Sequence, residues 1–135
     1  MPRLNITCAP LPALQRKQLA LDFTRELKAI GADAGHCLVF FKDLAESCAF
    51  RAGMPLPILD RDAQPAHFHL HLTVSAQRPQ AVLDALATSL RECLYRRYPN
   101  AFIYLEFDPI QPVHVYYGAG AQFTNAGYSQ GTSRP

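Results

Sequence analysis

The stretch HFHLHLTVSAQRP, residues 67–79, carries the signals of a strand followed by the start of a helix. Polar and apolar residues alternate strictly along 67–75, and four apolar side chains share one face: Phe68, Leu70, Leu72 and Val74. A period of two residues is typical of a strand with one buried face. Proline, here Pro79, is common in the first turn of a helix. The stretch therefore predicts a half-buried strand that leads into a helix.

The segments on either side complete this unit and repeat it. Residues 80–94 place leucines at helical steps, and AFIYLEFD at 101–108 alternates like 67–75. About 65 residues earlier, RLNITC at 3–8 alternates, a helical pattern runs from Pro12 to Ile30, and HCLVFFKDL at 36–44 is largely apolar. This self-similarity predicts two copies of one β-α-β unit.

The breaks between these segments divide the chain. We expect a single domain over residues 1–124, with units at about 2–44 and 67–108. A proline-containing linker at 45–66 joins the units, and loops of that length often line a site. A terminal strand broken by glycines is expected at 114–123. Residues 125–135 are small and polar, and we expect them to form a flexible tail.

The pattern predicts an α+β fold, in which the tandem units form a four-stranded mixed sheet with two helices on one face. Two helices can cover only one face of such a sheet. The alternate faces of the strands carry polar and aromatic residues: Arg3, Asn5, Thr7, His67, His69, His71, Thr73, Tyr104 and Glu106. We expect that uncovered face to be a subunit interface or a wet channel.

Composition restricts the classes of function. The 135 residues have a formal net charge of +2, which gives no reason to expect a nucleic-acid or membrane partner. No stretch approaches the roughly 20 apolar residues of a membrane span, and the amino terminus lacks a signal-peptide pattern. The four cysteines have no C-x-x-C spacing. We therefore expect a cytoplasmic protein with buried structural thiols, no metal and no cofactor.

Four short motifs stand in a recognisable order: MPRLNIT at 1–7, CAFRAG at 48–53, LTVSAQRP at 72–79 and IYLEFDP at 103–109. Together with the two units, over roughly residues 2–123, they resemble the tautomerase superfamily. The likeness is to members with two β-α-β units and an amino-terminal proline, such as macrophage migration inhibitory factor and 5-carboxymethyl-2-hydroxymuconate isomerase. The resemblance implies a homotrimer with active sites at the subunit boundaries and a small carboxylate substrate.

Pro2 is the first candidate catalytic residue. Removal of Met1, which is expected before a residue as small as proline, leaves Pro2 with a free secondary amine. The pKa of an α-amine is about 8, and burial or nearby cations such as Arg3 lower that pKa. A base of near-neutral pKa accepts protons efficiently at physiological pH. The resemblance gives this role to the amino-terminal proline.

Arg78 is the first candidate for substrate binding. It directly precedes Pro79, so we expect it beside the start of the second helix, where the helix dipole and free N–H groups favour anions. A guanidinium there can bind both oxygens of a carboxylate. The resemblance implies an arginine at this turn. Some members have a second arginine three residues earlier, where this chain has Ser75.

Tyr104 and Glu106 share the polar face of the last main strand. The resemblance implies that Tyr104 takes part in catalysis by binding substrate or water. Glu106 stands where macrophage migration inhibitory factor has asparagine, and we expect it to hold a water, to steer the protonation of Pro2 or to pair with Arg3 across a subunit boundary. Phe50 and Phe123 are expected to wall the pocket.

Three features depart from the resemblance or stay open. The lysine that it places after the first helix is missing, so a basic group there must come from another residue, such as Lys42 or Arg51. Tyr116 stands where a cis-dehalogenase has glutamate, which favours plain proton transfer over hydration. The histidines at 67, 69 and 71 share a strand face and could bind a metal, although polar packing at an interface is the preferred interpretation.

The expected activity is keto–enol tautomerisation, a 1,3-proton transfer on a small 2-oxo or 2-hydroxy-dienoate carboxylic acid with Pro2 as general base. An alternative is a decarboxylase, hydratase or dehalogenase of a small three-carbon acid, in which protonated Pro2 acts as an acid or forms an imine. A second alternative is a non-enzymatic ferredoxin-like ligand-binding domain, which has the same order of elements.

Overall fold

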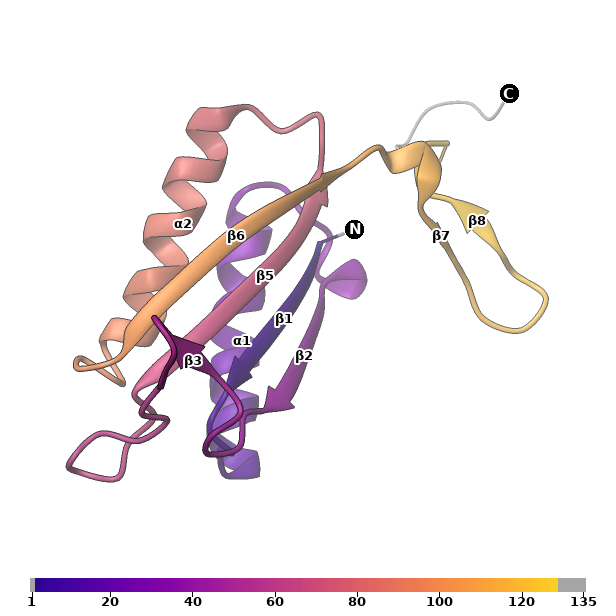
Figure 1. The fold of residues 1–135 in the computed structure, drawn as a ribbon. Helices are drawn as coiled ribbons and strands as arrows, with labels where there is room; N and C mark the ends of the chain where they lie inside the picture. The colour runs from indigo at the N-terminus through magenta and orange to yellow at the C-terminus, as the bar shows by residue number, and fades with distance from the viewer. Residues whose placement is uncertain (1, 129–135) are drawn as a thin grey trace.

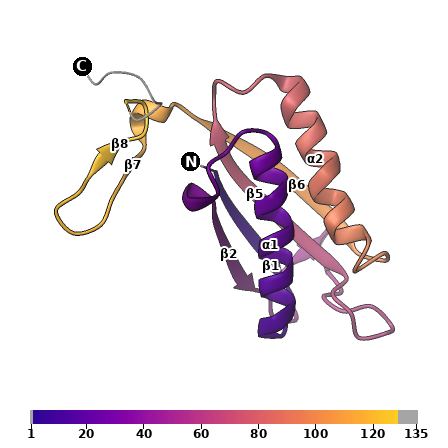
Figure 2. The ribbon, with the colours of Figure 1, turned by 180° about the vertical axis from the view of Figure 1, so that it is seen from behind.

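The structure, a computed structural model, describes residues 2–128. Six elements form the main body: β1 (Arg3–Cys8), α1 (Ala13–Ala29), β2 (Leu38–Asp43), β5 (His67–Ser75), α2 (Gln80–Tyr95) and β6 (Phe102–Ile110). Figures 1 and 2 show both helices on one face of the sheet. The predicted α+β architecture of two β-α-β units is confirmed.

The sheet is mixed, with the strand order β2-β1-β5-β6. β1 is parallel to β2 and antiparallel to β5, and β5 is parallel to β6. Two rows of the register locate the polar groups: Arg3–Thr73–Asp108 lies near the amino end of β1, and Thr7–His69–Tyr104 lies near its carboxyl end. β6 continues to Ile110, beyond the predicted end, because an edge strand tolerates Pro109.

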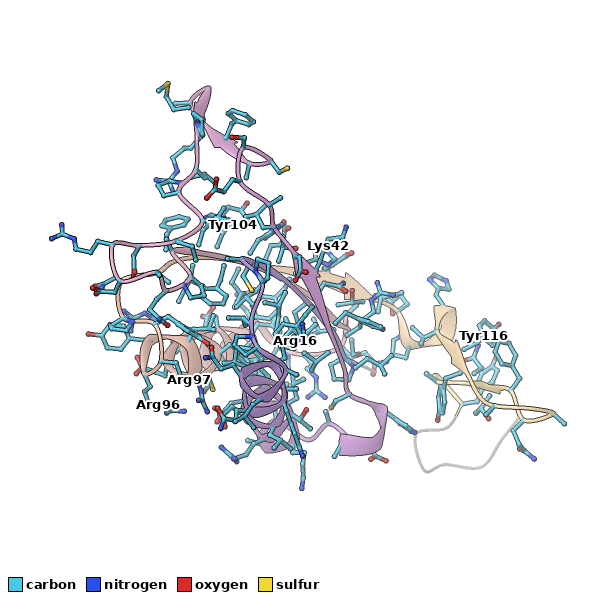
Figure 3. All side chains as sticks on the ribbon, turned by 90° about the horizontal axis from the view of Figure 1, so that it is seen from below. Arg16, Lys42, Arg96, Arg97, Tyr104 and Tyr116 are labelled. Atoms are coloured by element: carbon cyan, nitrogen blue, oxygen red, sulfur yellow. The ribbon has the colours of Figure 1, made fainter. Side chains whose placement is uncertain are left out.

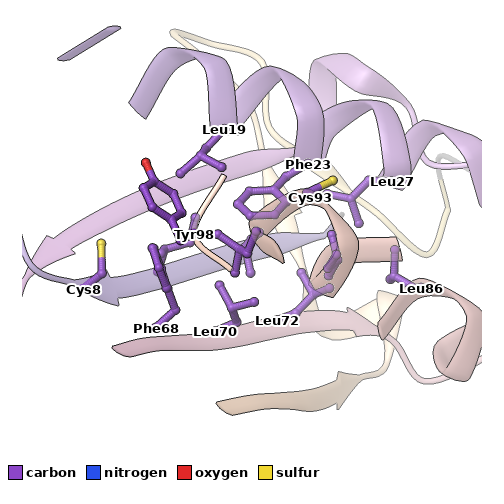
Figure 4. Close-up of a cluster of buried hydrophobic side chains, with 14 of the residues drawn as sticks. Cys8, Leu19, Phe23, Leu27, Phe68, Leu70, Leu72, Leu86, Cys93 and Tyr98 are labelled. Carbon is purple, nitrogen blue, oxygen red and sulfur yellow. The ribbon is translucent and has the colours of Figure 1, made fainter. Parts of the chain in front are cut away.

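The core lies between the helices and the sheet (Figure 4). Helix α1 buries Leu19, Phe23 and Leu27, which are spaced four residues apart. The inward faces of β1 and β5 and one face of α2 supply the rest of the largest buried side chains: Leu4, Ile6, Phe68, Leu70, Leu72, Val74, Leu86, Leu90 and Leu94. Each such side chain contributes roughly 1.5–3 kcal/mol by its transfer out of water, so this layer fixes the strand register.

The linker contains a short hairpin, formed by β3 (Phe50–Arg51) and β4 (Met54–Pro55). Ala52 and Gly53 form its turn with φ values of 51° and 79°, the left-handed region that two-residue hairpin loops require. The hairpin stands at the end of the sheet opposite the chain's N terminus (Figure 1).

The prediction of one terminal strand at 114–123 is wrong. A 3-10 turn, η2 (Pro112–His114), leads into an antiparallel pair of β7 (Tyr116–Tyr117) and β8 (Thr124–Asn125), which we call the arm. The glycines form its loop: a Cβ at Gly118 would collide with the carbonyl oxygen of Gln122, so no larger residue fits. The arm extends away from the sheet (Figure 1). Of the tail predicted at 125–135, residues 129–135 lie outside the described part.

The four thiols differ in environment. Cys8 and Cys93 are buried, Cys37 is partly buried, and Cys48 is exposed, so the expectation of buried thiols is wrong for Cys48. Burial, and to a smaller extent the negative charge of Asp43, raises the pKa of Cys8 to about 12. Burial also raises the pKa of Cys93. Because the thiolate is the reactive form, both core thiols should be inert in the folded protein.

Thiol alkylation at pH 8 tests this arrangement. We expect iodoacetamide to modify Cys48 first and to leave Cys8 and Cys93 intact until urea unfolds the chain, as followed by intact mass and peptide mapping. A Cys48→Ser variant is the control and should lose the fast modification only. Rapid modification of Cys8 in the folded protein would contradict the assigned core.

Candidate functional site

Pro2 lies buried at the head of β1. Its carbonyl oxygen accepts a hydrogen bond from the Leu38 N–H at 3.1 Å, which fixes it against the start of β2. The neighbouring Arg3 points to the uncovered face and donates from Nη2 to Thr73 Oγ1 at 3.3 Å. Since β1 and β5 are antiparallel, Pro2 lies beside the carboxyl end of β5, where the chain turns toward α2.

Arg78 lies in that turn, directly before Pro79, the N-cap of α2. Its Nη1 donates to the Ile30 carbonyl oxygen at 2.6 Å, so its charge also stabilises the carboxyl end of α1. Burial raises the pKa of Cys37, and the positive charge of Arg78 opposes this rise. Cys37 directly precedes Leu38, the residue bonded to Pro2, so Pro2 and Arg78 occupy the same end of the sheet.

A pocket of about 280 Å³, here called the turn pocket, opens beside Arg78. Its walls are the turn from Ser75 to Pro79, the end of β6 at Ile110, and the base of the arm at Pro112 and Val115. Backbone bonds join these parts, including one from the Ala76 N–H to the Ile110 carbonyl oxygen at 2.8 Å. The pocket therefore offers a guanidinium and an apolar wall at the end of the sheet that holds Pro2.

A second, wider pocket lies at the other end of the sheet, beside the β3–β4 hairpin; we call it the hairpin pocket. It has a volume of about 560 Å³. The linker, β5 and β6 all supply its walls: Phe50, Arg51, Leu56, His67, His69, Phe102, Tyr104 and Glu106. Three of the predicted site residues, Phe50, Tyr104 and Glu106, thus meet in one pocket.

Glu106 is held by a histidine. The Glu106 Oε1 atom lies 2.8 Å from Nε2 of His69, whose ring also packs edge-on against Tyr104 at 5.3 Å between centroids. His71 makes a longer contact with a carboxylate, with its Nε2 lying 3.5 Å from Asp108 Oδ2. Within the chain Glu106 contacts His69, and Arg3 bonds to Thr73, so pairing of Glu106 with Arg3 across a subunit boundary stays a prediction.

Arg51 has no carboxylate within ion-pair distance among residues 2–128, and it lies 4.5 Å above the ring of Phe102. His67 stacks on the same ring at 5.5 Å. Burial, followed by the positive charge of Arg51 and the neighbouring His69, lowers the pKa of His67, so its neutral form is favoured. Its Nδ1 is buried without a hydrogen-bond partner in the described part of the chain.

No three histidine, cysteine or acidic side chains gather as metal ligands within residues 2–128. His69 and His71 each lie beside a carboxylate, and His67 lies on Phe102. None of the helices in this part of the chain is long and apolar enough to cross a bilayer.

The predicted site residues do not converge within one chain. The rows Thr73–Asp108 and His69–Tyr104 are four residues apart, roughly 13 Å at ~3.3 Å per residue, and Pro2 lies beyond the first row. Phe123 lies on the arm, 73% exposed and stacked on Tyr116 at 5.5 Å. Figure 3 shows Tyr116 on the arm, well separated from Tyr104 in the main body.

Comparison with known proteins gives a match at the level of structure. No protein-family model matches the chain, and neither does any curated protein. The crystal structure of Pt0534 inactivated by 2-oxo-3-pentynoate is similar over 96% of this chain and 99% of its own, with a TM-score of 0.74 and 15% identity. A fused 4-OT, described as an asymmetric trimer, matches over 96% and 99%, with a TM-score of 0.70 and 20% identity.

A macrophage migration inhibitory factor from Toxoplasma gondii matches over 90% of this chain and 99% of its own, with a TM-score of 0.64 and 15% identity. These three structures are similar to this chain over 90–96% of its length. The likeness inferred from the sequence motifs is confirmed: the chain has the fold of the tautomerase superfamily.

Proposed function

We propose that this protein is a keto–enol tautomerase that acts on a small 2-oxo or 2-hydroxy-dienoate carboxylic acid, with the amine of Pro2 as general base. The observation that carries the proposal is the position of Pro2, buried at the head of β1 and at the end of the sheet that holds Arg78. Met1, whose removal frees the amine, lies outside the described residues.

The proposed reaction moves one proton and leaves the substrate's composition unchanged. The Pro2 nitrogen takes a proton alpha to the carbonyl, and the electron pair moves toward the carbonyl oxygen. The protonated amine then returns the proton at the conjugated position. Arg78 binds the substrate carboxylate beside the start of α2, where the guanidinium and helix dipole both favour an anion.

The hairpin pocket of a second copy is proposed to complete the site in a homotrimer. Tyr104 lies too far from Pro2 in its own chain to touch the same small substrate, so its hydroxyl must come from another copy to donate to the enolate oxygen. Leu38 and Phe40 are exposed on the edge strand β2, as suits an interface. The trimer of the fused 4-OT supports this arrangement.

The aromatic residues have separate places in this proposal. Phe50 walls the hairpin pocket next to Tyr104. Phe123 is proposed to contribute to the pocket wall only from the arm, because the arm places it away from the sheet of its own chain.

Hydration or decarboxylation of a small acid is the second candidate. It is favoured by Glu106, because a carboxylate held by His69 at 2.8 Å can accept a proton from a bound water. Turnover of phenylpyruvate, set against turnover of malonate semialdehyde or of a 3-halo-acrylate, separates the two candidates.

Modification by 2-oxo-3-pentynoate tests the base. This electrophilic 2-oxo acid should form a single adduct on the nitrogen of Pro2, and intact mass should show Met1 absent from the active protein. Replacement Pro2→Ala should lower kcat for phenylpyruvate ketonisation by about 100-fold or more, since a positioned base contributes at least that factor. Unchanged thermal unfolding is the control for folding. Full activity in protein that retains Met1 would contradict the assignment.

Replacement of Arg78 tests carboxylate binding. We expect Arg78→Gln to raise KM for phenylpyruvate by about 10- to 100-fold, because hydrogen bonds to charged groups contribute about 1.5–3 kcal/mol. Arg78→Lys should recover part of the loss, since it keeps the charge without the bidentate fork. Arg96→Gln, at the exposed far end of α2, is the matched control and should leave KM unchanged. An Arg78→Gln protein with unaltered KM would show that Arg78 serves only to hold the end of α1.

A further inference from the structure

The hairpin pocket contains a guanidinium and a carboxylate that do not pair with each other. Arg51 and Glu106 both line it. The Arg51 Cζ atom lies 4.5 Å from the centroid of the Phe102 ring, whereas Glu106 Oε1 lies 2.8 Å from His69 Nε2. An arginine facing a carboxylate in a shared pocket would ordinarily form a bidentate ion pair. The separation of these two charges therefore requires an explanation.

Arg51 is arranged to receive an external anion. Arg51 lies over the ring of Phe102 and lines the pocket, and a guanidinium carries five N–H donors with which it can bind an anion. Within residues 2–128 no carboxylate lies within 4 Å of it, so its fork has no partner of opposite charge. Phe50, Leu56 and Phe102 add apolar walls beside it. The guanidinium could therefore bind the carboxylate of a small acid, and the apolar walls could contact the rest of that acid.

The contact between His69 and Glu106 explains why Glu106 does not pair with Arg51. The Nε2 atom of His69 lies within hydrogen-bond distance of Glu106, and an N–H there occupies the carboxylate. If this contact were lost, Glu106 would be the nearest anion lining the pocket and would compete for Arg51. Two other side chains face this pair. Tyr104 packs on His69. The neutral form of His67 is favoured, because burial lowers its pKa.

We infer that the hairpin pocket is a binding site for a small carboxylic acid, with Arg51 as its anion-binding residue and His69 as a positioning residue that keeps Glu106 away from Arg51. The inference rests on the proposed function only for the claim that this acid is the substrate of Pro2. Binding itself requires neither the amine of Pro2 nor turnover.

Calorimetric titration of the full-length protein tests the anion site. The probes are 3-phenylpropanoate and its neutral amide, 3-phenylpropanamide. Neither compound has a 2-oxo group, so neither can undergo keto–enol tautomerisation. We expect the acid to bind more tightly than the amide. Arg51→Gln should weaken binding of the acid about 10-fold or more and leave the amide unaffected. Lys42→Gln is the matched control, because Lys42 is an exposed cation of the uncovered face outside the pocket, and should leave both affinities unchanged.

A second pair of variants tests the role of His69. His69→Ala should weaken binding of the acid, because Glu106 is released to pair with Arg51. Adding Glu106→Gln to His69→Ala should restore binding toward the wild-type value, a rescue that a merely structural role of His69 would not produce. Equal affinity of wild type and Arg51→Gln, or no rescue in a folded double variant, would overturn the inference. Turnover that persists in Pro2→Ala would refute the proposed base and would leave the binding result for Arg51 and His69 intact.

Discussion

The antiparallel pairing of β1 with β5 is the constraint on which the rest of the arrangement depends. It places Arg3 opposite Thr73 and Thr7 opposite His69. Pro2 consequently lies beside the turn that contains Arg78. Tyr104 of β6 is opposite His69 of β5 and therefore lies at the other end of the sheet. A shift of one residue would move the buried leucines of β1 and β5 to the uncovered face, so the hydrophobic layer under α1 and α2 holds this register.

This register divides the chemistry between two ends of one subunit. The end with Pro2 offers a buried amino-terminal residue and a guanidinium at a helix start. The end with the hairpin offers a hydroxyl, a histidine-held carboxylate and a free guanidinium. A reaction that needs a base and a hydrogen-bond donor on the same small acid is incomplete in one chain. Assembly of copies, with one end facing the other, is the simplest geometry that unites them.

Much of the fold could be predicted because alternation and helical spacing are local properties of the sequence. The strict alternation at 67–75 and the leucines of both helices fixed the order and faces of the main elements. The arm could not be predicted in this way. Its two short strands depend on the turn at Gly118, where another part of the loop approaches the backbone closely, and no periodicity in 114–123 signals that approach.

The sequence indicates several residues of the candidate site, but it does not indicate which side chains those residues contact. Tyr104, Glu106 and Phe50 were identified from one strand face and one motif, and they do share a pocket. The partner of Glu106 was missed because His69 is its diagonal neighbour on the adjacent strand, a relation that exists only once the register is known. The feature of the sequence that could have indicated this contact was the strand face with three histidines at 67, 69 and 71. The environment of Arg51 depends likewise on the fold of the linker.

The most direct test of the central claim, that Pro2 and Tyr104 of different copies form one active site, is complementation between two inactive variants. Subunits carrying Pro2→Ala and subunits carrying Tyr104→Phe are unfolded in urea, mixed in equal amounts and refolded together. In a trimer with sites at the boundaries, about a quarter of the sites recover both native residues, so we expect activity near that fraction of wild type. Activity no greater than that of either variant refolded alone, in an assembly shown by mass to contain both subunits, would contradict the account.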